Sequence, residues 1–287
     1  MHLSPRKKLL FAMPILVSVL AVFLLFHFQR DEHLFASLCQ NLFTTEMQGD
    51  TLTMHYHLRH PEDFQIYSYE PALPVYQAGS ELSAPVTLEN TLAKLKRIDP
   101  EHLSEQNRFL YQLLKRSLTL QLSLSQYSYY SDPLSPSGGM QTELPLLLTE
   151  YRFDTVRDVE DYLALLDQYD SYLSGLLIYE QEKAAAGKFM AESSAQKVIE
   201  QCHSLLDHQQ LLEGTHFLQI TFRERTEELY QNQILSHEQK NRYDEENDRL
   251  LQTVVQPAYE TLADGLEILK GQSRQLAGLS TYPQGSD

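Results

Sequence analysis

The sequence has few cysteines and few basic residues, and each shortage excludes a class of protein. Its 287 residues include only Cys39 and Cys202, too few for a disulfide scaffold and without the paired spacing of a cysteine zinc site. The two thiols either form one bridge in an oxidising compartment or stay separate, with Cys202 packed as a small apolar residue. The 23 basic against 39 acidic side chains give a net charge of -16. This charge argues against nucleic acid as a partner and against binding of anionic lipids by the soluble part.

Catalytic motifs of fixed spacing are also missing. A zinc peptidase helix needs His-Glu-x-x-His, but after His237-Glu238 the position of the second histidine is occupied by Asn241. The sequence has no Gly-x-Ser-x-Gly elbow, and no Lys-Ser/Thr follows Gly138-Gly139 as it would in a phosphate-binding loop. We therefore assign no catalytic, cofactor-binding or metal-binding residue in this chain.

A long apolar run near the N-terminus predicts a membrane anchor. Residues 9–28 carry no charge, and a helix of that length, at ~1.5 Å per residue, reaches about 30 Å, enough to cross a bilayer. Basic residues precede the run and acidic residues follow it, so the positive-inside rule predicts a cytoplasmic tail (1–8), one transmembrane helix (9–28) and an extracytoplasmic region (29–287) in the cell membrane. A cleaved signal peptide is the competing interpretation, but bulky residues follow the run where small ones would be expected.

Hydrophobic periodicity predicts an all-α fold after the anchor. Residues 31–46 have a helical pattern, and from residue 87 onward apolar residues recur at steps of three and four. Residues 118–124 also alternate in a strand-like way, but they continue the helical pattern that begins near Ser104. Between these regions, the proline-rich and aromatic segment 49–85 predicts an irregular stretch with a short strand or two, packed on the helices.

Local signals place the ends of several helices. Thr155 with Asp158, and Ser236 with Gln239, are capping-box pairs, and Gly187 supplies a left-handed stop. We expect one long acidic helix from the first pair to Gly187, a further helix over 195–205, and a last helix from the second pair to residue 271. Two prolines qualify this picture, because Pro145 suits the first turn of a helix starting at residue 144, and Pro257 should kink the last helix.

Two groups of residues have the spacing of metal ligands. The first is a set of three histidines: His55, His57 and His60. The second is a carboxylate–histidine–carboxylate row on one expected helix face: Glu200, His203 and Asp207. Three imidazoles within six positions suit zinc or copper, but an exposed or structural role is the simpler interpretation of the histidines. A solvated helix face is the simpler interpretation of the row.

The glycine-rich loop before residue 144 has two interpretations. It is either a turn that leads the chain into a helix, or a cleft-lining loop whose backbone N–H groups hold an extended peptide or another ligand. The second interpretation makes four residues candidate site residues: Ser137, Gly138, Gly139 and Gln141.

Two stretches of the sequence resemble a known bacterial family. One runs from Asp132-Pro-Leu-Ser-Pro-Ser-Gly-Gly-Met-Gln-Thr-Glu-Leu-Pro145 to Tyr179-Glu-Gln-Glu-Lys-Ala-Ala-Ala-Gly187-Lys-Phe189, and the other is Gln256-Pro-Ala-Tyr259. They resemble the domain-of-unknown-function family 885 (DUF885), whose full-length members look like zinc metallopeptidases with His-Glu-x-x-His in the C-terminal half. The resemblance covers residues 40–287 and implies the N-terminal half of such a protein, by truncation, gene splitting or fragmentation.

Two functions follow from this reading. The first is the N-terminal part of a membrane-anchored, zinc-metallopeptidase-like protein that is inactive alone. Its zinc is expected only in a complete family member, and its partners are the membrane, through residues 9–28, and a C-terminal half encoded downstream. The alternative is a non-catalytic extracytoplasmic helical module that binds a peptide or a protein partner.

Overall fold

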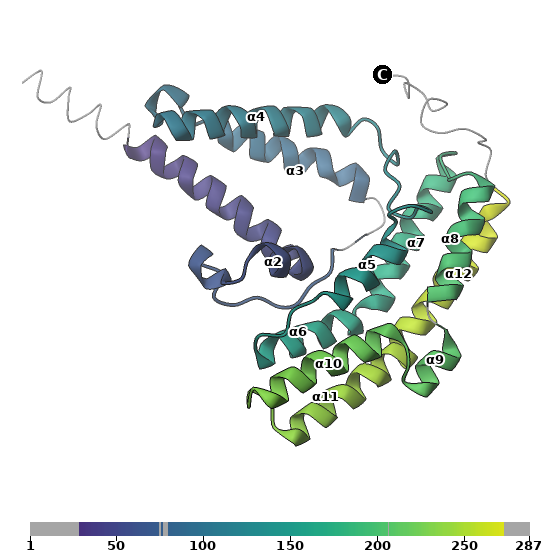
Figure 1. Ribbon diagram of the computed structural model, residues 1–287. Coiled ribbons are helices and arrows are strands. Elements are labelled where there is room, and N and C mark those ends of the chain that lie inside the picture. Colours follow the sequence, from purple (N-terminus) through teal and green to yellow (C-terminus); the bar gives the residue numbers. More distant parts are fainter. Residues whose placement is uncertain (1–28, 75, 77–79, 206, 273–287) are drawn as a thin grey trace, which may run out of the picture. The chain divides into compact units, whose positions relative to one another are not determined.

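The computed structural model describes residues 29–74, 76, 80–205 and 207–272 (Figure 1). Every regular element in these ranges is a helix and none is a strand, which confirms the all-α prediction for the described part of the chain. The chain divides into two compact units, Met1–Phe43 with Leu82–Gln126, and Thr44–Glu81 with Tyr127–Asp287. A helix over residues 29–49 runs from the first unit into the second.

The predicted anchor, residues 9–28, lies outside the described residues. Among the helices of residues 29–272 that the structure describes, none is both long enough and apolar enough to span a bilayer.

The first unit contains the start of the helix over residues 29–49, most of α3 (Ser80–Leu95), the short η2 (Pro100–His102) and α4 (Glu105–Leu124). Glu32 fixes the start of α4, because its carboxylate accepts hydrogen bonds from the backbone and hydroxyl of Ser104 and from the amide of Asn107, at 2.7–3.0 Å. A small apolar core lies behind these contacts: Phe35, Leu92, Leu95, Ile98, Leu103, Tyr111 and Leu118.

The leucines with the strand-like alternation lie in α4. Leu118 is buried, whereas Leu120 is 56% exposed and Leu124 is 52% exposed, as expected where a helix shows one face to a core and another to solvent. The helical interpretation of residues 118–124 is therefore confirmed.

The second unit is a larger set of packed helices. Its elements are α2 (Thr51–His57), η1 (Pro61–Phe64), α5 (Met140–Thr149), α6 (Val156–Asp167), α7 (Tyr169–Ala185), α8 (Glu192–Leu205), α9 (His208–Glu213), α10 (Phe217–Gln231), α11 (His237–Leu250), the π-helical η3 (Leu251–Val255) and α12 (Gln256–Lys270). Helix α12 packs on α8 and α10 packs on α11 (Figure 1). Helix α12 also contacts α7, and α5 contacts α8 and α10.

The predicted helix ends are largely correct. Thr155 with Asp158 and Ser236 with Gln239 both form complete capping boxes, and Gly187 has a φ of 71°. The expected single helix up to Gly187 is wrong, however, because Gln168 interrupts it. The Gln168 side chain donates to the carbonyl of Pro71 at 2.8 Å and accepts from the N–H of Leu73 at 3.1 Å.

The segment before α3 is packed on these helices, as predicted. Ile66 and Leu73 are each 3% exposed, and Leu73 belongs to the main core. Three features differ from the prediction: residues 51–57 form α2, the described part contains no strand, and α3 already begins at Ser80.

Pro145 and Pro257 lie at other positions in their helices than the sequence predicts. Helix α5 begins at Met140, so the placement of Pro145 in its first turn is wrong and the proline lies inside the helix. Pro257 lies at the start of α12 and follows the π-helical turn η3. A π-turn pairs residues five apart and widens the helix locally, so it accommodates a residue that has no N–H to donate.

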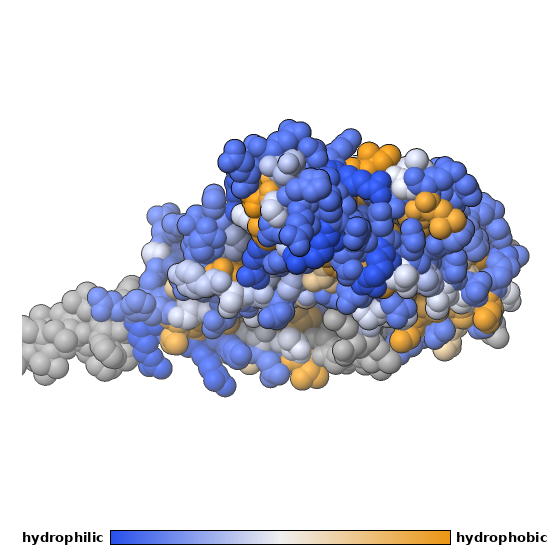
Figure 2. All heavy atoms as spheres, turned by 90° about the horizontal axis from the view of Figure 1, so that it is seen from below, coloured by the Kyte–Doolittle hydropathy of each residue, from blue (hydrophilic) through white to orange (hydrophobic). Residues whose placement is uncertain are grey.

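Exposed apolar side chains of the second unit lie mainly on different helices, for example Leu146 (59%), Leu212 (60%) and Ile268 (74%). In the view of Figure 2, hydrophilic residues cover most of the described surface, and hydrophobic ones form separate patches. Single exposed apolar residues are normal on a folded protein and point to no binding surface by themselves.

Candidate functional site

A pocket of about 570 Å³ lies among α2, the segment after it and the turn that leads into α6. Its lining combines charged and aromatic side chains with an apolar floor: His55, Arg59, Glu62, Tyr67, Tyr69, Arg152, Asp154, Arg157 and Asp158, with Met54, Leu58 and Ile66. A pocket of this size with a few directional polar groups is typical of a ligand-binding site.

His55 forms one wall of the pocket. Its ring stacks on Tyr151 with centroids 3.7 Å apart and planes 10° apart, and its Nε2 accepts a 3.0 Å hydrogen bond from the backbone N–H of Arg152. A backbone N–H can only donate, so Nε2 carries no proton and the neutral ring holds its proton on Nδ1. Burial lowers the pKa of His55 to about 4, against the smaller opposing effect of Asp158. The ring is therefore neutral at pH 7.

Tyr69, Arg157 and Asp161 form a compact group at the pocket. The Tyr69 hydroxyl donates a 2.6 Å hydrogen bond to the Asp161 carboxylate, and the Arg157 guanidinium lies 4.1 Å from the Tyr69 ring centre. Burial, helped by the hydrogen bond to Asp161, raises the pKa of Tyr69 to about 12. Arg157 also donates to the Tyr69 carbonyl at 2.8 Å, so the group fixes the extended segment to α6.

The other two arginines differ in how firmly they are held. Arg152 donates through Nη2 to the carbonyl of His55 at 2.7 Å. Within the described part of the chain, Arg59 makes a 3.8 Å ion pair with Asp154, and both side chains are more than half exposed. Such a pair contributes little to stability and is readily exchanged for a ligand.

The three histidines with the spacing of metal ligands, His55, His57 and His60, do not point toward one another. His57 contacts the carbonyl of Thr53 at 2.8 Å, and His60 contacts the Glu62 carboxylate at 3.2 Å, while His55 faces Arg152. Within residues 29–272, as far as the structure describes them, no group of three His, Cys, Asp or Glu side chains is placed to hold a metal ion. The described residues therefore do not fit a catalytic zinc.

The carboxylate, histidine and carboxylate expected on one helix face do not all lie on α8. Helix α8 ends at Leu205, and Asp207 caps the next helix by accepting a 3.0 Å hydrogen bond from the N–H of Gln210. Glu200 accepts from Gln196 one turn earlier. The expectation that Glu200, His203 and Asp207 share one helix face is wrong because the helix ends before its last member.

The glycine loop closes tightly on the start of α5. Ser137 and Gly138 are exposed, whereas Gly139 is buried and caps the helix. A Cβ atom at Gly139 would lie 2.4 Å from the backbone N and 2.6 Å from the backbone O of Ser135. Gln141 is fully buried, and its amide donates to the Ser135 carbonyl and to Gln201. The cleft-lining role of these four residues stays a prediction.

A smaller apolar pocket of about 210 Å³ lies beside this loop. Met140, which follows Gly139, lines it together with Leu144 and Leu147 of α5 and Leu52 and Tyr56 of α2. Helix α2 therefore borders both pockets, through His55 on one and Tyr56 on the other.

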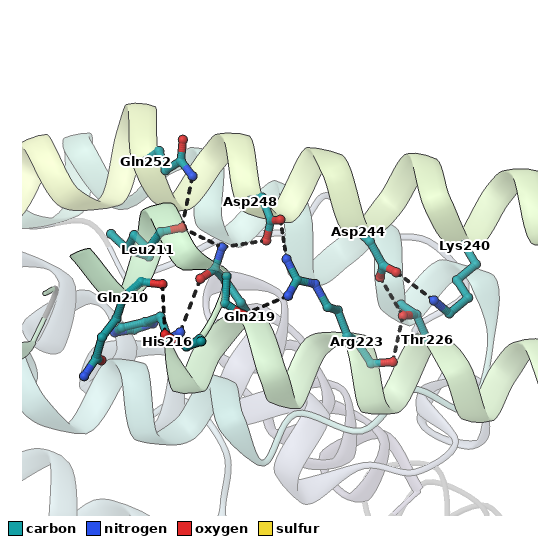
Figure 3. Close-up of polar contacts among 12 residues, drawn as sticks. Gln210, Leu211, His216, Gln219, Arg223, Thr226, Lys240, Asp244, Asp248 and Gln252 are labelled. Atoms are coloured by element: carbon teal, nitrogen blue, oxygen red, sulfur yellow. Dashed lines mark hydrogen bonds and ion pairs between the residues drawn. The ribbon is translucent and has the colours of Figure 1, made fainter. Parts of the chain in front are cut away.

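Helices α10 and α11 share a second dense group of polar side chains (Figure 3). Asp248 accepts from Gln219 at 2.8 Å and from Arg223 at 2.5 Å, and Asp244 accepts from Thr226 and Lys240. Because donors and acceptors of the two helices satisfy one another, this group stabilises the helix pair.

The arginine-lined pocket did not emerge from the sequence. Its walls come from residues 54–69 and 152–158, which no local motif connects. The available signals were the capping box at Thr155 and two arginines, Arg152 and Arg157, in a strongly acidic chain.

The described part of the chain is therefore helical, contains a pocket lined by charged and aromatic side chains, and has no metal-ligand group. The family model for "Bacterial protein of unknown function (DUF885)" matches residues 67–286, and the chain belongs to this family. No curated protein matches the sequence.

One solved structure with a similar fold is a protein from Colwellia psychrerythraea described as a putative lipoprotein. It shares 18% sequence identity with a TM-score of 0.66, over 91% of this chain and 44% of that protein. The likeness shows a common fold, and the chain spans less than half of that protein's length.

Proposed function

We propose that this chain is the peptide-binding, N-terminal part of a membrane-anchored, zinc-peptidase-like DUF885 protein, and that it is inactive alone. The arginine-lined pocket carries the proposal. It combines about 570 Å³ of space with an apolar floor, three guanidinium groups and two side chains, His55 and Tyr69, whose pKa values depart strongly from their usual range. Such side chains gather at functional sites.

The chemistry of the pocket favours binding over catalysis. The Nε2 atom of His55 is occupied by the backbone N–H of Arg152, and the proton of Tyr69 is held by Asp161. A general base needs a free acceptor and a pKa near the working pH, and neither group has both. Peptide hydrolysis by the complete protein would draw its zinc ligands from a C-terminal half encoded downstream.

The pocket also suits the alternative, a non-catalytic extracytoplasmic module for a peptide or protein partner. A downstream reading frame that encodes His-Glu-x-x-His favours the peptidase part, and its absence favours the module. In both cases residues 9–28 are proposed to anchor the chain, with the N-terminus in the cytoplasm. Protease added to intact spheroplasts should then digest the region after residue 30, and full protection would refute this topology.

The binding proposal is tested with a random hexapeptide library passed over the immobilised full chain. We expect retention that falls when exposed residues of the pocket rim, Tyr67 or Arg59, are changed to Ala. The matched control is Ile268→Ala, which alters an exposed side chain of α12 away from the pocket lining. Equal retention by all variants would refute binding at this pocket.

The zinc proposal has a separate test. After dialysis, the purified full chain should contain less than one zinc ion per molecule and show no chelator-sensitive cleavage of peptides. One tightly bound zinc per chain, lost in His57→Ala or His203→Ala, would overturn it.

A further inference from the structure

The arginines of the pocket retain N–H groups that no other described residue accepts a hydrogen bond from. One Nη of Arg152 donates a hydrogen bond to the His55 carbonyl. Nε of Arg157 donates to the Asp161 carboxylate, and one Nη of Arg157 donates to the Tyr69 carbonyl. A guanidinium has five N–H donors, so each has further N–H groups for a ligand. Among the residues that the structure describes, Arg59 is held by its 3.8 Å contact with Asp154.

The acidic side chains of the lining are largely occupied. Asp158 accepts from the backbone N–H groups of Asp154 and Thr155 and from the Thr155 hydroxyl, at 2.7–2.9 Å. Glu62 contacts His60 at 3.2 Å. The formal charges of the lining arginines and carboxylates nevertheless balance, so selectivity has to come from the direction of the free donors and not from net charge.

We infer that this pocket selects a peptide through a carboxylate group, which Arg152 and Arg59 bind. The inference rests on the proposed peptide-binding function and adds the chemical group that is recognised. The Arg152 guanidinium is already held by one hydrogen bond, from Nη2 to the His55 carbonyl. A planar fork fixed in this way loses little conformational freedom when it forms two parallel hydrogen bonds to a carboxylate.

Arg59 binds the ligand carboxylate in place of its present partner, Asp154. Its contact with Asp154 is long and solvent-exposed, with side-chain exposures of 70% and 54%. An incoming carboxylate with good geometry replaces such a contact at little cost. A cationic ligand would meet the guanidinium groups of Arg59, Arg152 and Arg157 beside the lining carboxylates, and these groups would repel it. The carboxylate belongs either to the C-terminus of a peptide or to an Asp or Glu side chain.

Three hexapeptide libraries separate these cases on the immobilised full chain. The first has free C-termini and no acidic residue, the second has amidated C-termini and no acidic residue, and the third has amidated C-termini with Asp and Glu included. We expect the first or the third to be retained at least about tenfold more than the second. Retention of the first identifies a C-terminal carboxylate, and retention of the third identifies an acidic side chain.

Charge-removing variants assign the effect to the pocket. Arg152→Gln should abolish the preference, and Arg59→Gln should reduce it. Arg59 is exposed, so the second variant tests the inference even if Arg152→Gln fails to fold. Arg249→Gln, which removes a half-exposed arginine of α11, is the matched control and should keep the preference.

The failures are distinguishable. Equal retention of all three libraries overturns the carboxylate inference and leaves peptide binding intact. A preference that survives Arg59→Gln and Arg152→Gln also overturns it. Retention of no library overturns the proposed function together with the inference.

Discussion

The hydroxyl of Tyr259 donates a 2.8 Å hydrogen bond to the main-chain carbonyl of Gln141, 118 positions earlier in the chain. In an uninterrupted α-helix that carbonyl would accept from the N–H of residue 145. Pro145 has no N–H, and the carbonyl inside α5 is left for another donor. Tyr259 lies on α12 and is 2% exposed, so the bond joins α12 to α5 inside the protein.

Removing this hydroxyl should destabilise the fold measurably. Tyr259→Phe leaves the Gln141 carbonyl buried without a partner, and we expect the free energy of unfolding to fall by about 1–2 kcal/mol. Urea denaturation followed by circular dichroism measures the change. Tyr151→Phe is the matched control, because the Tyr151 hydroxyl is buried with no hydrogen-bond partner among the described residues. Its removal should be neutral or stabilising. Equal losses in both variants would contradict this account.

The glycine before α5 should tolerate no side chain. In Gly139→Ala the new Cβ would meet the backbone of Ser135 at 2.4 Å, and backbone atoms there cannot move without opening the turn. We expect a loss of stability of about 2 kcal/mol or more. Gly49→Ala is the control, because no atom lies within 4 Å of its Cβ position. This variant should melt at or above the temperature of the parent. A Gly139→Ala protein with unchanged stability would show that the turn is not closely packed.

The sequence predicts the helices well where the signal is local. Both capping boxes and the left-handed Gly187 depend on residues within one helical turn of each other, so their side chains suffice to predict them. The interruption at Gln168 has no such signal. It coincides with hydrogen bonds to Pro71 and Leu73, 97 and 95 positions away, while the apolar pattern continues through it without a change.

The pocket was missed for the same reason. His55 and Arg152 meet only after the second unit has folded, and neither is preceded by a motif that marks it. The two groups with the spacing of metal ligands, for which an exposed or structural role was the simpler interpretation, do not converge among the described residues. Their spacing along the chain was suitable, but the side chains of His57 and His60 bond within their own segments, and α8 ends before Asp207. Spacing alone does not establish convergence.

The two cysteines should react at different rates. Both are free thiols in the structure. Cys202 is 2% exposed, and burial raises its pKa to about 12, whereas Cys39 is only half-buried. Because the thiolate is the reactive form, iodoacetamide at pH 8 should label Cys39 first and Cys202 only after unfolding in urea. Cys39→Ser should abolish labelling of the native protein, as mass spectrometry can measure. Labelling of native Cys202 would contradict its burial.

The buried carboxyl group of Glu180 should make the protein less stable as pH rises. Glu180 is fully buried, and neither of its oxygens has a hydrogen-bond partner among the described residues. Burial raises its pKa from 4.5 to about 7, although nearby Lys183 opposes the shift. Lys183 itself donates to the carbonyl of Ser131 at 2.9 Å and to the Asp132 carboxylate.

The sign follows from proton binding. Between pH 4.5 and about 7 the folded protein holds a proton on Glu180 that the unfolded chain has released. The contribution of protonated Glu180 to the stability of the fold is therefore complete below pH 4.5 and is lost as pH rises through about 7. In Glu180→Gln the side chain cannot ionise. We therefore expect the free energy of unfolding of the variant, relative to that of the parent, to rise by about 2–3 kcal/mol between pH 4.5 and pH 8. Urea midpoints of both proteins at several pH values measure this difference. A difference that is constant with pH would show that Glu180 does not titrate in this range.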